Sequence, residues 1–248
     1  LWDDKMVKQL KSQLGMLLIP DELKELRGGT IDEFNIFVNG EKVTQDTSGL
    51  NTALIKLTAT AKYDKATDRT VFRYHIDKRV KASKETGGYI WDRQEVSYPD
   101  DTMSHAKVLT EDGNRFGDAK LVFYHFPQGG NYAEEQKKIV SRKAIQDFLK
   151  KHQGIKIFKD NSRLFPFGEP GHDTLFDWAG IDKATLGKQM GGRIRLNTLV
   201  GFVFVTDDAT VGIKEVATRQ GVMETPQFAN LKEDFVIEMY NALNTYKG

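Results

Sequence analysis

The chain lacks cysteine altogether among its 248 residues. This absence excludes disulfide bonds, thiolate metal sites and a cysteine nucleophile, and it fits a reducing compartment, so a cytoplasmic location is expected. Long apolar runs are also missing. The longest, LVGFVFV from Leu199 to Val205, is far shorter than the roughly 20 residues that cross a bilayer. The formal net charge of +1 gives no overall attraction to nucleic acid or acidic membranes, so any such binding needs a local patch.

The common catalytic motifs are absent as well. The chain has no G-x-x-x-x-G-K-[ST] loop, no G-x-G-x-x-G fingerprint and no H-E-x-x-H helix. Its histidines lack the spacing of metal ligands, so no metal site is predicted. His125 lies in an apolar strand pattern, which favours a structural role, and the pair His172-Asp173 could orient a general base but has no nucleophile motif beside it. The sequence therefore shows no self-contained active site.

Apolar periodicity divides the first half into a helix and several strands. Apolar residues recur at helical spacing from Val7 to Leu17 before Pro20, which predicts an opening helix whose apolar face packs on a neighbour. Asn39-Gly40 predicts a hairpin, because both central positions of its turn favour positive φ. Alternation from Ala53 to Tyr63 predicts a strand with one solvated face. The charged stretch 78–117 is expected to be a long excursion or loop.

The second half has a different pattern. The run from Glu134 to His152 predicts one helix, and a hairpin with its turn at 159–162 should follow. A short helix is expected around Leu175–Asp182. The apolar run 199–205 predicts a strand buried on both faces. Thr225 and Pro226 predict the start of a C-terminal helix, with Thr225 as its N-cap.

Together these elements predict an α+β or mixed α/β fold in which helices back layers of β-sheet. We expect two parts, a β-rich N-terminal subdomain with the opening helix (1–128) and an α/β subdomain (129–248). In the second part the order helix, hairpin, strand and helix predicts a β-α-β crossover, right-handed if the joined strands are parallel.

Two blocks of the second half carry a joint pattern. From Gly154 to Asp182 the chain has a hairpin with a D-x-x-R turn, then P-[FY]-G-E, then aspartate and tryptophan before an Ile-Asp pair. This block resembles the region after the ATP-binding domain of bacterial GHKL-type ATPases, a group that includes gyrase B, MutL and a heat-shock chaperone. The block from Leu196 to Val236 resembles the next part, where the family has a strand, an aspartate turn, [ST]-x-R-[EQ]-G and a final helix; here the turn reads A-T-R-Q-G, with Thr218 directly before Arg219. The resemblance covers about 128–246, and the spacing between glycine and tryptophan in GHDTLFDWAGID is longer than usual.

The resemblance implies a middle, or transducer, region that couples ATP binding and hydrolysis to conformational change. The family binds ATP with an E-x-x-x-N helix and a D-x-G-x-G loop, and the latter does not occur here. ATP and Mg are therefore expected in the full-length protein and not in this fragment, which starts without methionine and is expected to come from a longer chain. The implied partners are an N-terminal ATP-binding domain of the same chain, a second copy in a homodimer, and nucleic acid or a client protein. No membrane partner is expected.

Within ATRQG, the resemblance implies that Arg219 contacts the γ-phosphate of ATP held by the other domain, with Thr218 and Gln220 beside it. A guanidinium is always charged and presents a planar fork of donors, which suits phosphate. Alternatively, Arg219 is a solvated turn residue or neutralises Glu224. Another arginine of the pattern, Arg163, could be structural and pair with Asp160, or it could contact a partner domain.

Other functions remain open from the sequence. A non-catalytic module could bind protein or nucleic acid through the stretch 78–117 and the basic loop GGRIR, where Lys188, Arg193 and Arg195 gather. A hydrolase that uses His172-Asp173 is a third possibility. A D-x-G-x-G loop in the sequence upstream of Leu1 would distinguish the ATPase from the binding module.

Overall fold

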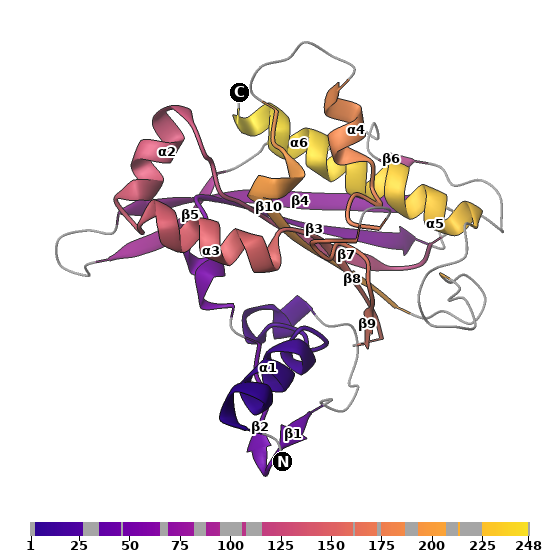
Figure 1. Cartoon of the computed structure of the whole chain (residues 1–248). Coiled ribbons are helices and arrows are strands. Elements are labelled where there is room, and N and C mark those ends of the chain that lie inside the picture. The colour runs from indigo at the N-terminus through magenta and orange to yellow at the C-terminus, as the bar shows by residue number, and fades with distance from the viewer. Residues whose placement is uncertain are drawn as a thin grey trace.

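A mixed eight-stranded sheet forms the centre of the protein in a computed structural model (Figure 1). The structure describes residues 3–26, 35–45, 47–64, 69–81, 88–94, 106–107, 116–160, 162–172, 175–186, 193–206, 213 and 225–247. In sheet order, the strands are β5 (Tyr89–Gln94), β4 (Arg69–Lys81), β3 (Ile55–Asp64), β7 (Ala119–His125), β10 (Leu199–Val205), β8 (Gly154–Lys159) and β9 (Ser162–Leu164), with β6 (Ala106–Lys107) paired to β4.

The strand directions confirm the expected fold class. Among the described strands, only β8 and β10 pair in parallel, and all other neighbours are antiparallel. The connection from β8 to β10 contains β9 and the short helix α4 (Ile181–Leu186), so a crossover with a helix is present in the C-terminal half. β7 pairs with both β3 and β10, so strands from either side of residue 128 share one sheet.

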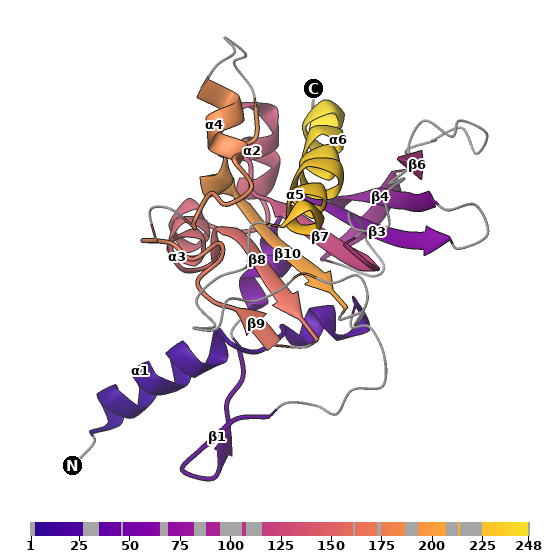
Figure 2. The ribbon, with the colours of Figure 1, turned by 90° about the vertical axis from the view of Figure 1, so that its right-hand side faces the viewer.

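Helices cover both faces of the sheet, as the two ribbon views show (Figures 1 and 2). One face carries the C-terminal helix, which consists of α5 (Pro226–Asn230), a π-helical turn (Leu231–Val236) and α6 (Ile237–Lys247). The other face carries α3 (Arg142–His152) and the 3₁₀ turns η1 (Asp21–Leu26) and η2 (Ser48–Thr52). None of the helices in the described part of the chain has the length and apolar composition needed to span a bilayer.

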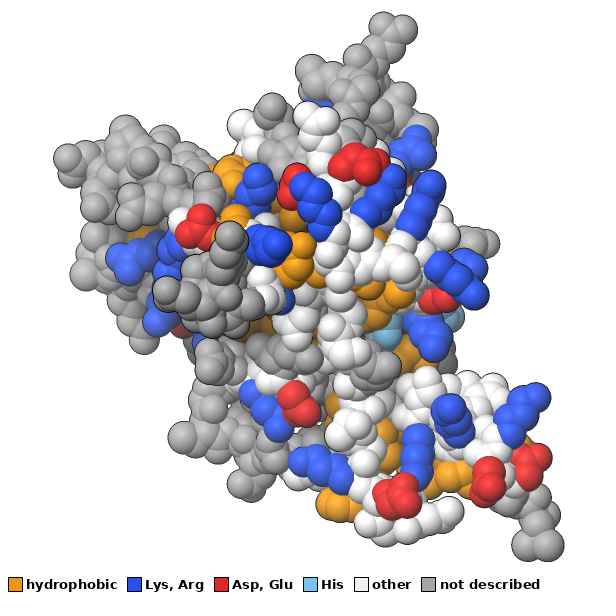
Figure 3. Space-filling view, turned by 90° about the vertical axis from the view of Figure 1, so that its left-hand side faces the viewer, with side chains coloured by type: hydrophobic (Ala, Val, Ile, Leu, Met, Phe, Trp, Pro, Cys, Tyr) orange, Lys and Arg blue, Asp and Glu red, His pale blue; other side chains and the backbone are white. Residues whose placement is uncertain are grey.

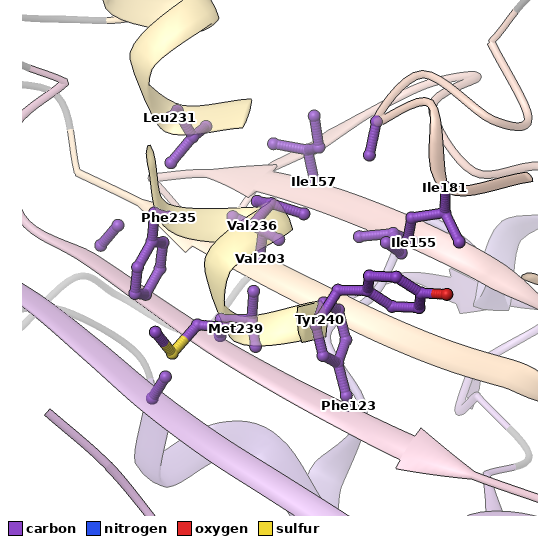
Figure 4. Close-up of a cluster of buried hydrophobic side chains, with 14 of the residues drawn as sticks. Phe123, Ile155, Ile157, Ile181, Val203, Leu231, Phe235, Val236, Met239 and Tyr240 are labelled. Atoms are coloured by element: carbon purple, nitrogen blue, oxygen red, sulfur yellow. The ribbon is translucent and has the colours of Figure 1, made fainter. Parts of the chain in front are cut away.

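The C-terminal helix packs on the larger of two hydrophobic clusters (Figure 4). Its buried side recurs at the spacing expected from the sequence, in the order Phe228, Leu231, Phe235, Met239 and Leu243. The predicted N-cap is confirmed, because the hydroxyl of Thr225 accepts a hydrogen bond from the Phe228 amide at 3.3 Å. Burying each such large apolar side chain contributes about 1.5–3 kcal/mol, which fixes this helix on the sheet.

The smaller cluster lies between the sheet and α3, and here the structure corrects the sequence prediction. Ile145 and Leu149 are buried as expected, but the helix expected over 134–152 is divided into α2 (Gly130–Lys137) and α3. The reason is Ser141, whose hydroxyl accepts from the Ala144 amide at 3.3 Å and so begins a new helix. The division lets α3 take its own direction across β8 and β10.

The opening helix, α1 (Asp4–Gly15), and the hairpin of β1 (Phe37–Val38) and β2 (Glu41–Lys42) form an N-terminal lobe beside the sheet (Figure 2). The hairpin prediction is confirmed, since Asn39 and Gly40 have φ of 54° and 79°. The apolar residues of α1, from Val7 to Leu14, are only half-buried and belong to neither core cluster.

The described parts of the stretch expected as a loop over 78–117 contain regular structure, while residues 82–87, 95–105 and 108–115 lie outside the described residues. β4 continues to Lys81, and every residue of β5 pairs with a residue of β4. Trp91 of β5 lies beneath the guanidinium of Arg79 and the ammonium of Lys56, each 4.9 Å from the ring centroid. Cross-strand cation–π contacts of this type stabilise an edge strand.

Candidate functional site

The motif unit, the described part of residues 154–182, contains the first block that resembles the ATPases. Its hairpin turn has Asp160 at φ 46°, as expected for a turn at 159–162. Arg163 of β9 forms an ion pair with Glu169 of the P-F-G-E segment, and both side chains are almost fully buried. A second guanidinium nitrogen of Arg163 donates to the backbone oxygen of Met16 at 2.6 Å, immediately after α1. Arg163 therefore joins β9 and the nearby P-F-G-E segment to the end of α1, which is far away in the sequence.

Lys156 lies in the same buried polar region, between apolar residues of β8. Its ammonium donates to the backbone oxygens of His152, Gln153 and Gly154, where α3 ends. Burial lowers the pKa of Lys156 well below its usual value; the Arg163 guanidinium lowers it further, and Glu169 opposes this. The contacts satisfy helix-end carbonyls that have no partner within the helix. Lys156 thus ties the end of α3 to the sheet.

The aspartate and tryptophan of the motif also have structural partners. The indole N–H of Trp178 donates to the backbone oxygen of Ile155 at 2.8 Å. The carboxylate of Asp177 accepts from the amides of Ile181 and Asp182 at 2.7 and 2.9 Å. Burial raises the pKa of Asp177, while these amide hydrogen bonds oppose the rise. Because Asp177 caps it, α4 begins at Ile181, later than the helix expected around 175–182.

The glycine of P-F-G-E is required by close packing. Gly168 has φ of 69°, and a Cβ there would overlap the backbone carbonyl of Ile155. The motif residues described above all have partners within the fold. The sequence pattern therefore corresponds to a set of internal contacts that stabilise this part of the protein. The structure supports the structural interpretation of Arg163, with Glu169 as the partner in its ion pair.

The residues proposed to meet ATP belong to the second block of the resemblance. Thr218, Arg219 and Gln220 lie outside the described residues, and so do Glu224 and Asp173. Their roles stay predictions. His172, the partner expected for Asp173, is exposed and packs edge-on against Phe165, with ring centroids 5.5 Å apart.

The basic loop GGRIR is described only from Arg193 onward, so Lys188 and the two glycines lie outside the described part. Ile194 is anchored on α6: its amide donates to Asn244 at 2.9 Å and its oxygen accepts from the Tyr240 hydroxyl at 2.7 Å. Arg195 is exposed, whereas Arg193 is half-buried. The two arginines flank a fixed backbone segment.

A groove of about 910 Å³ separates the N-terminal lobe from α3. Its lining includes five lysines, and we call it the lysine groove. They are Lys8, Lys11, Lys42, Lys150 and Lys151. On the face shown in Figure 3, Lys and Arg side chains are frequent both on the sheet-bearing body and on the lobe below it. The sequence contains a signal for this groove, since Lys8 and Lys11 share one face of α1, but helical spacing alone does not tell which face meets a neighbour.

No group of three or more metal-ligating side chains occurs among the residues that the structure places. Comparison with protein-family models, curated proteins and solved structures finds no match to the chain.

Proposed function

We propose that the chain is the transducer region of a cytoplasmic GHKL-type ATPase. The observation that carries this proposal is the buried contact of Arg163 with Glu169 and with the backbone oxygen of Met16. Residues that define the family-like pattern are the same residues that join the end of α1 to the sheet. A contact of this kind suits a region that passes movement from one domain to another.

In this proposal an ATP-binding domain precedes α1 in the same chain and holds ATP and Mg. A displacement of α1 then pulls on Met16, and the buried Arg163 transfers the displacement to β9 and the P-F-G-E segment. Packed interiors respond to such shifts as units because they contain few voids. The parent protein acts as a homodimer, and the movement reaches a client or nucleic acid.

In this proposal Arg219 also acts from this region on the ATP-binding domain. Its guanidinium binds the γ-phosphate when the two domains close, with Thr218 and Gln220 positioning the turn. Removing such an arginine lowers turnover about 10³-fold where its effect has been separated from others.

The test uses the parent protein with its upstream domain. Arg219→Ala should lower ATP turnover about 10³-fold with little change in the dissociation constant of ATP, because the contact forms only after closure. The exposed Arg195→Ala serves as a matched control and should retain normal turnover. Normal turnover in Arg219→Ala, or ATP hydrolysis by the purified 248-residue chain alone, would rule the proposal out.

A second function, binding of a macromolecule, is favoured by the lysine groove. It is compatible with the first, because a transducer region also has to contact what the ATPase acts on. It does not depend on ATP and can be measured on this chain directly.

A further inference from the structure

The two helices beside the lysine groove each present one stripe of side chains to it. In α1, Lys8, Lys11 and Ser12 have the spacing i, i+3 and i+4, and all three line the groove. Side chains at these positions lie above one another on a helix, so both lysines point to the same side. The N-terminal wall of the groove is therefore basic.

In α3 the residues that line the groove recur in the same way, at Ala144, Asp147 and Lys151. The adjacent face of this helix, with Ile145 and Leu149, is buried on the sheet. Because the sheet fixes one face of α3, the orientation of the other face is fixed as well. The second wall is thus a rigid surface of the fold.

The charges of the groove are unbalanced. In the described part of the chain, no carboxylate forms an ion pair with Lys8, Lys150 or Lys151. Two of the three acidic residues in the lining are already engaged, since Glu41 pairs with Lys11 and Glu169 pairs with Arg163. Asp147 is the third. The groove consequently has an excess of positive charge and attracts an anionic occupant.

Apolar side chains also line the groove, some of them on α3 and some near the end of α1. They are Met16, Val43, Val140, Ala144, Phe148 and Pro170. Phe148 is stacked on His152 and tilted against Phe126, with centroids 4.5 and 5.6 Å apart, so its ring is held in place. A volume of about 910 Å³ lies near the upper limit of small-ligand pockets and leaves room for several side chains of a bound segment.

We propose that the lysine groove binds an acidic peptide segment of another protein, with apolar side chains on the floor and carboxylates toward the lysines. Peptides that enter grooves between helices place an apolar face on the floor and polar residues along the rim. A nucleic-acid strand offers phosphates on its backbone and has no aliphatic side chains for such a floor. The lining contains lysines but no arginine, the residue best suited to grip phosphate in two-pronged contacts. These features favour the peptide.

The probe is a fluorescent peptide with leucines at helical spacing and glutamates at most other positions, titrated with the 248-residue chain and followed by anisotropy. We expect saturable binding that weakens with added salt, because exposed charges are screened. Replacing the leucines of the probe by serine should weaken binding, and so should replacing its glutamates by glutamine. A single-stranded oligothymidylate should not displace the peptide.

Two double variants locate the site. Lys8→Glu with Lys151→Glu reverses one charge on each wall and should weaken binding roughly tenfold or more. Lys62→Glu with Lys143→Glu makes the same change in net charge at exposed positions outside the groove and should leave the affinity unchanged. Circular dichroism and urea unfolding check that both variants fold. If the first does not, Ala144→Gln, which narrows the groove without changing charge, replaces it and should also weaken binding.

Three results would overturn this proposal. The first is an equal loss of affinity in both double variants, which would indicate a general effect of net charge. The second is tighter binding of the oligothymidylate than of the peptide, with the loss confined to the groove variant, which would assign the groove to nucleic acid. The third is no binding of the peptide at low salt. None of these results bears on the proposed ATPase role of Arg219, which is tested in the parent protein.

Discussion

Two ion pairs of this protein have similar chemistry but very different surroundings. The side chains of Arg163 and Glu169 are 1% and 8% exposed, whereas those of Lys11 and Glu41 are 27% and 76% exposed. In the buried pair each charge depends on its partner, because no water replaces a lost contact. In the exposed pair water and salt screen both charges. The difference indicates that the attachment of the N-terminal lobe to the sheet depends on Arg163. The contact between α1 and its hairpin, in contrast, does not depend on the ion pair of Lys11 with Glu41.

The largest effect is expected when Glu169 is replaced by alanine. Arg163 would then stay buried without its counter-charge, at a position where burial already lowers the pKa of the guanidinium and Glu169 opposes that effect. Removing one partner of a buried pair costs about 3–5 kcal/mol. Urea unfolding of the 248-residue chain measures the change in the free energy of unfolding.

Glu41→Ala provides the matched control for that measurement. The hydrogen bond from Lys11 lowers the pKa of the Glu41 carboxyl, but this carboxyl lies in solvent. We expect no resolvable shift of the unfolding midpoint. Equal destabilisation by the two substitutions would mean that burial does not determine how much each ion pair contributes to the free energy of unfolding.

The next largest effect is expected from alanine substitutions at two glycines, which separate the cost of close packing from the cost of backbone conformation. Gly168 and Gly171 have φ of 69° and 92°, so alanine is strained at either position. No described atom lies within 4 Å of a Cβ at Gly171, whereas a Cβ at Gly168 overlaps Ile155. Gly171→Ala should therefore cost about 1 kcal/mol from conformation alone. Gly168→Ala should cost roughly 1–3 kcal/mol more, since the backbone segments at Gly168 and Ile155 have to move apart.

These two glycine variants are compared by urea unfolding under the same conditions. Similar destabilisation in both would show that the sheet accommodates a methyl group beside Ile155. It would also weaken the packing explanation for the glycine of P-F-G-E.

The smallest effect appears only in alkaline solution and concerns Tyr240. Burial raises the pKa of its hydroxyl from 10.0 to about 12. Below pH 10.0 the phenol is protonated in both folded and unfolded chains, so its full contribution to stability is present. Between these two values the unfolded chain ionises first, and stability falls with rising pH.

Tyr240→Phe removes that titration together with the hydrogen bond to Ile194. The stability difference between wild type and the variant should be largest below pH 10.0 and should shrink as pH approaches about 12. Urea midpoints of both proteins across this range give the difference directly. A difference independent of pH would show that the hydroxyl ionises equally well in the folded protein.

Much of the local structure follows from short stretches of the sequence. Asn39-Gly40 gives a hairpin because both residues tolerate positive φ, and Thr225 begins the last helix because its hydroxyl binds the Phe228 amide. The apolar run 199–205 is a strand buried along its whole length, as its composition indicates. The turn and the cap need only neighbours in the chain, whereas the strand also needs β7 and β8 beside it.

Predictions failed where a distant segment changes the outcome. The run 89–94 has apolar residues only in its first half, and it is a strand because β4 supplies its hydrogen bonds and Arg79 covers Trp91. The division of the helix at Ser141 had a local signal, a serine at the cap position, which the apolar periodicity obscured. Lys8 and Lys11 visibly share one face of α1 in the sequence, but the lysine groove itself requires the relative placement of two helices, which the sequence does not give.

By itself, the sequence determined most of the elements and which of their faces are apolar, because periodicity and caps act over a few residues. It also singled out Arg163, Glu169, Asp177 and Trp178 as a pattern. Only the tertiary structure decided their partners. Arg163 meets the backbone of Met16 from 147 positions away. Whether a charge is buried against a counter-charge or left in water depends on how the elements pack, and that decides how strongly the charge bears on stability.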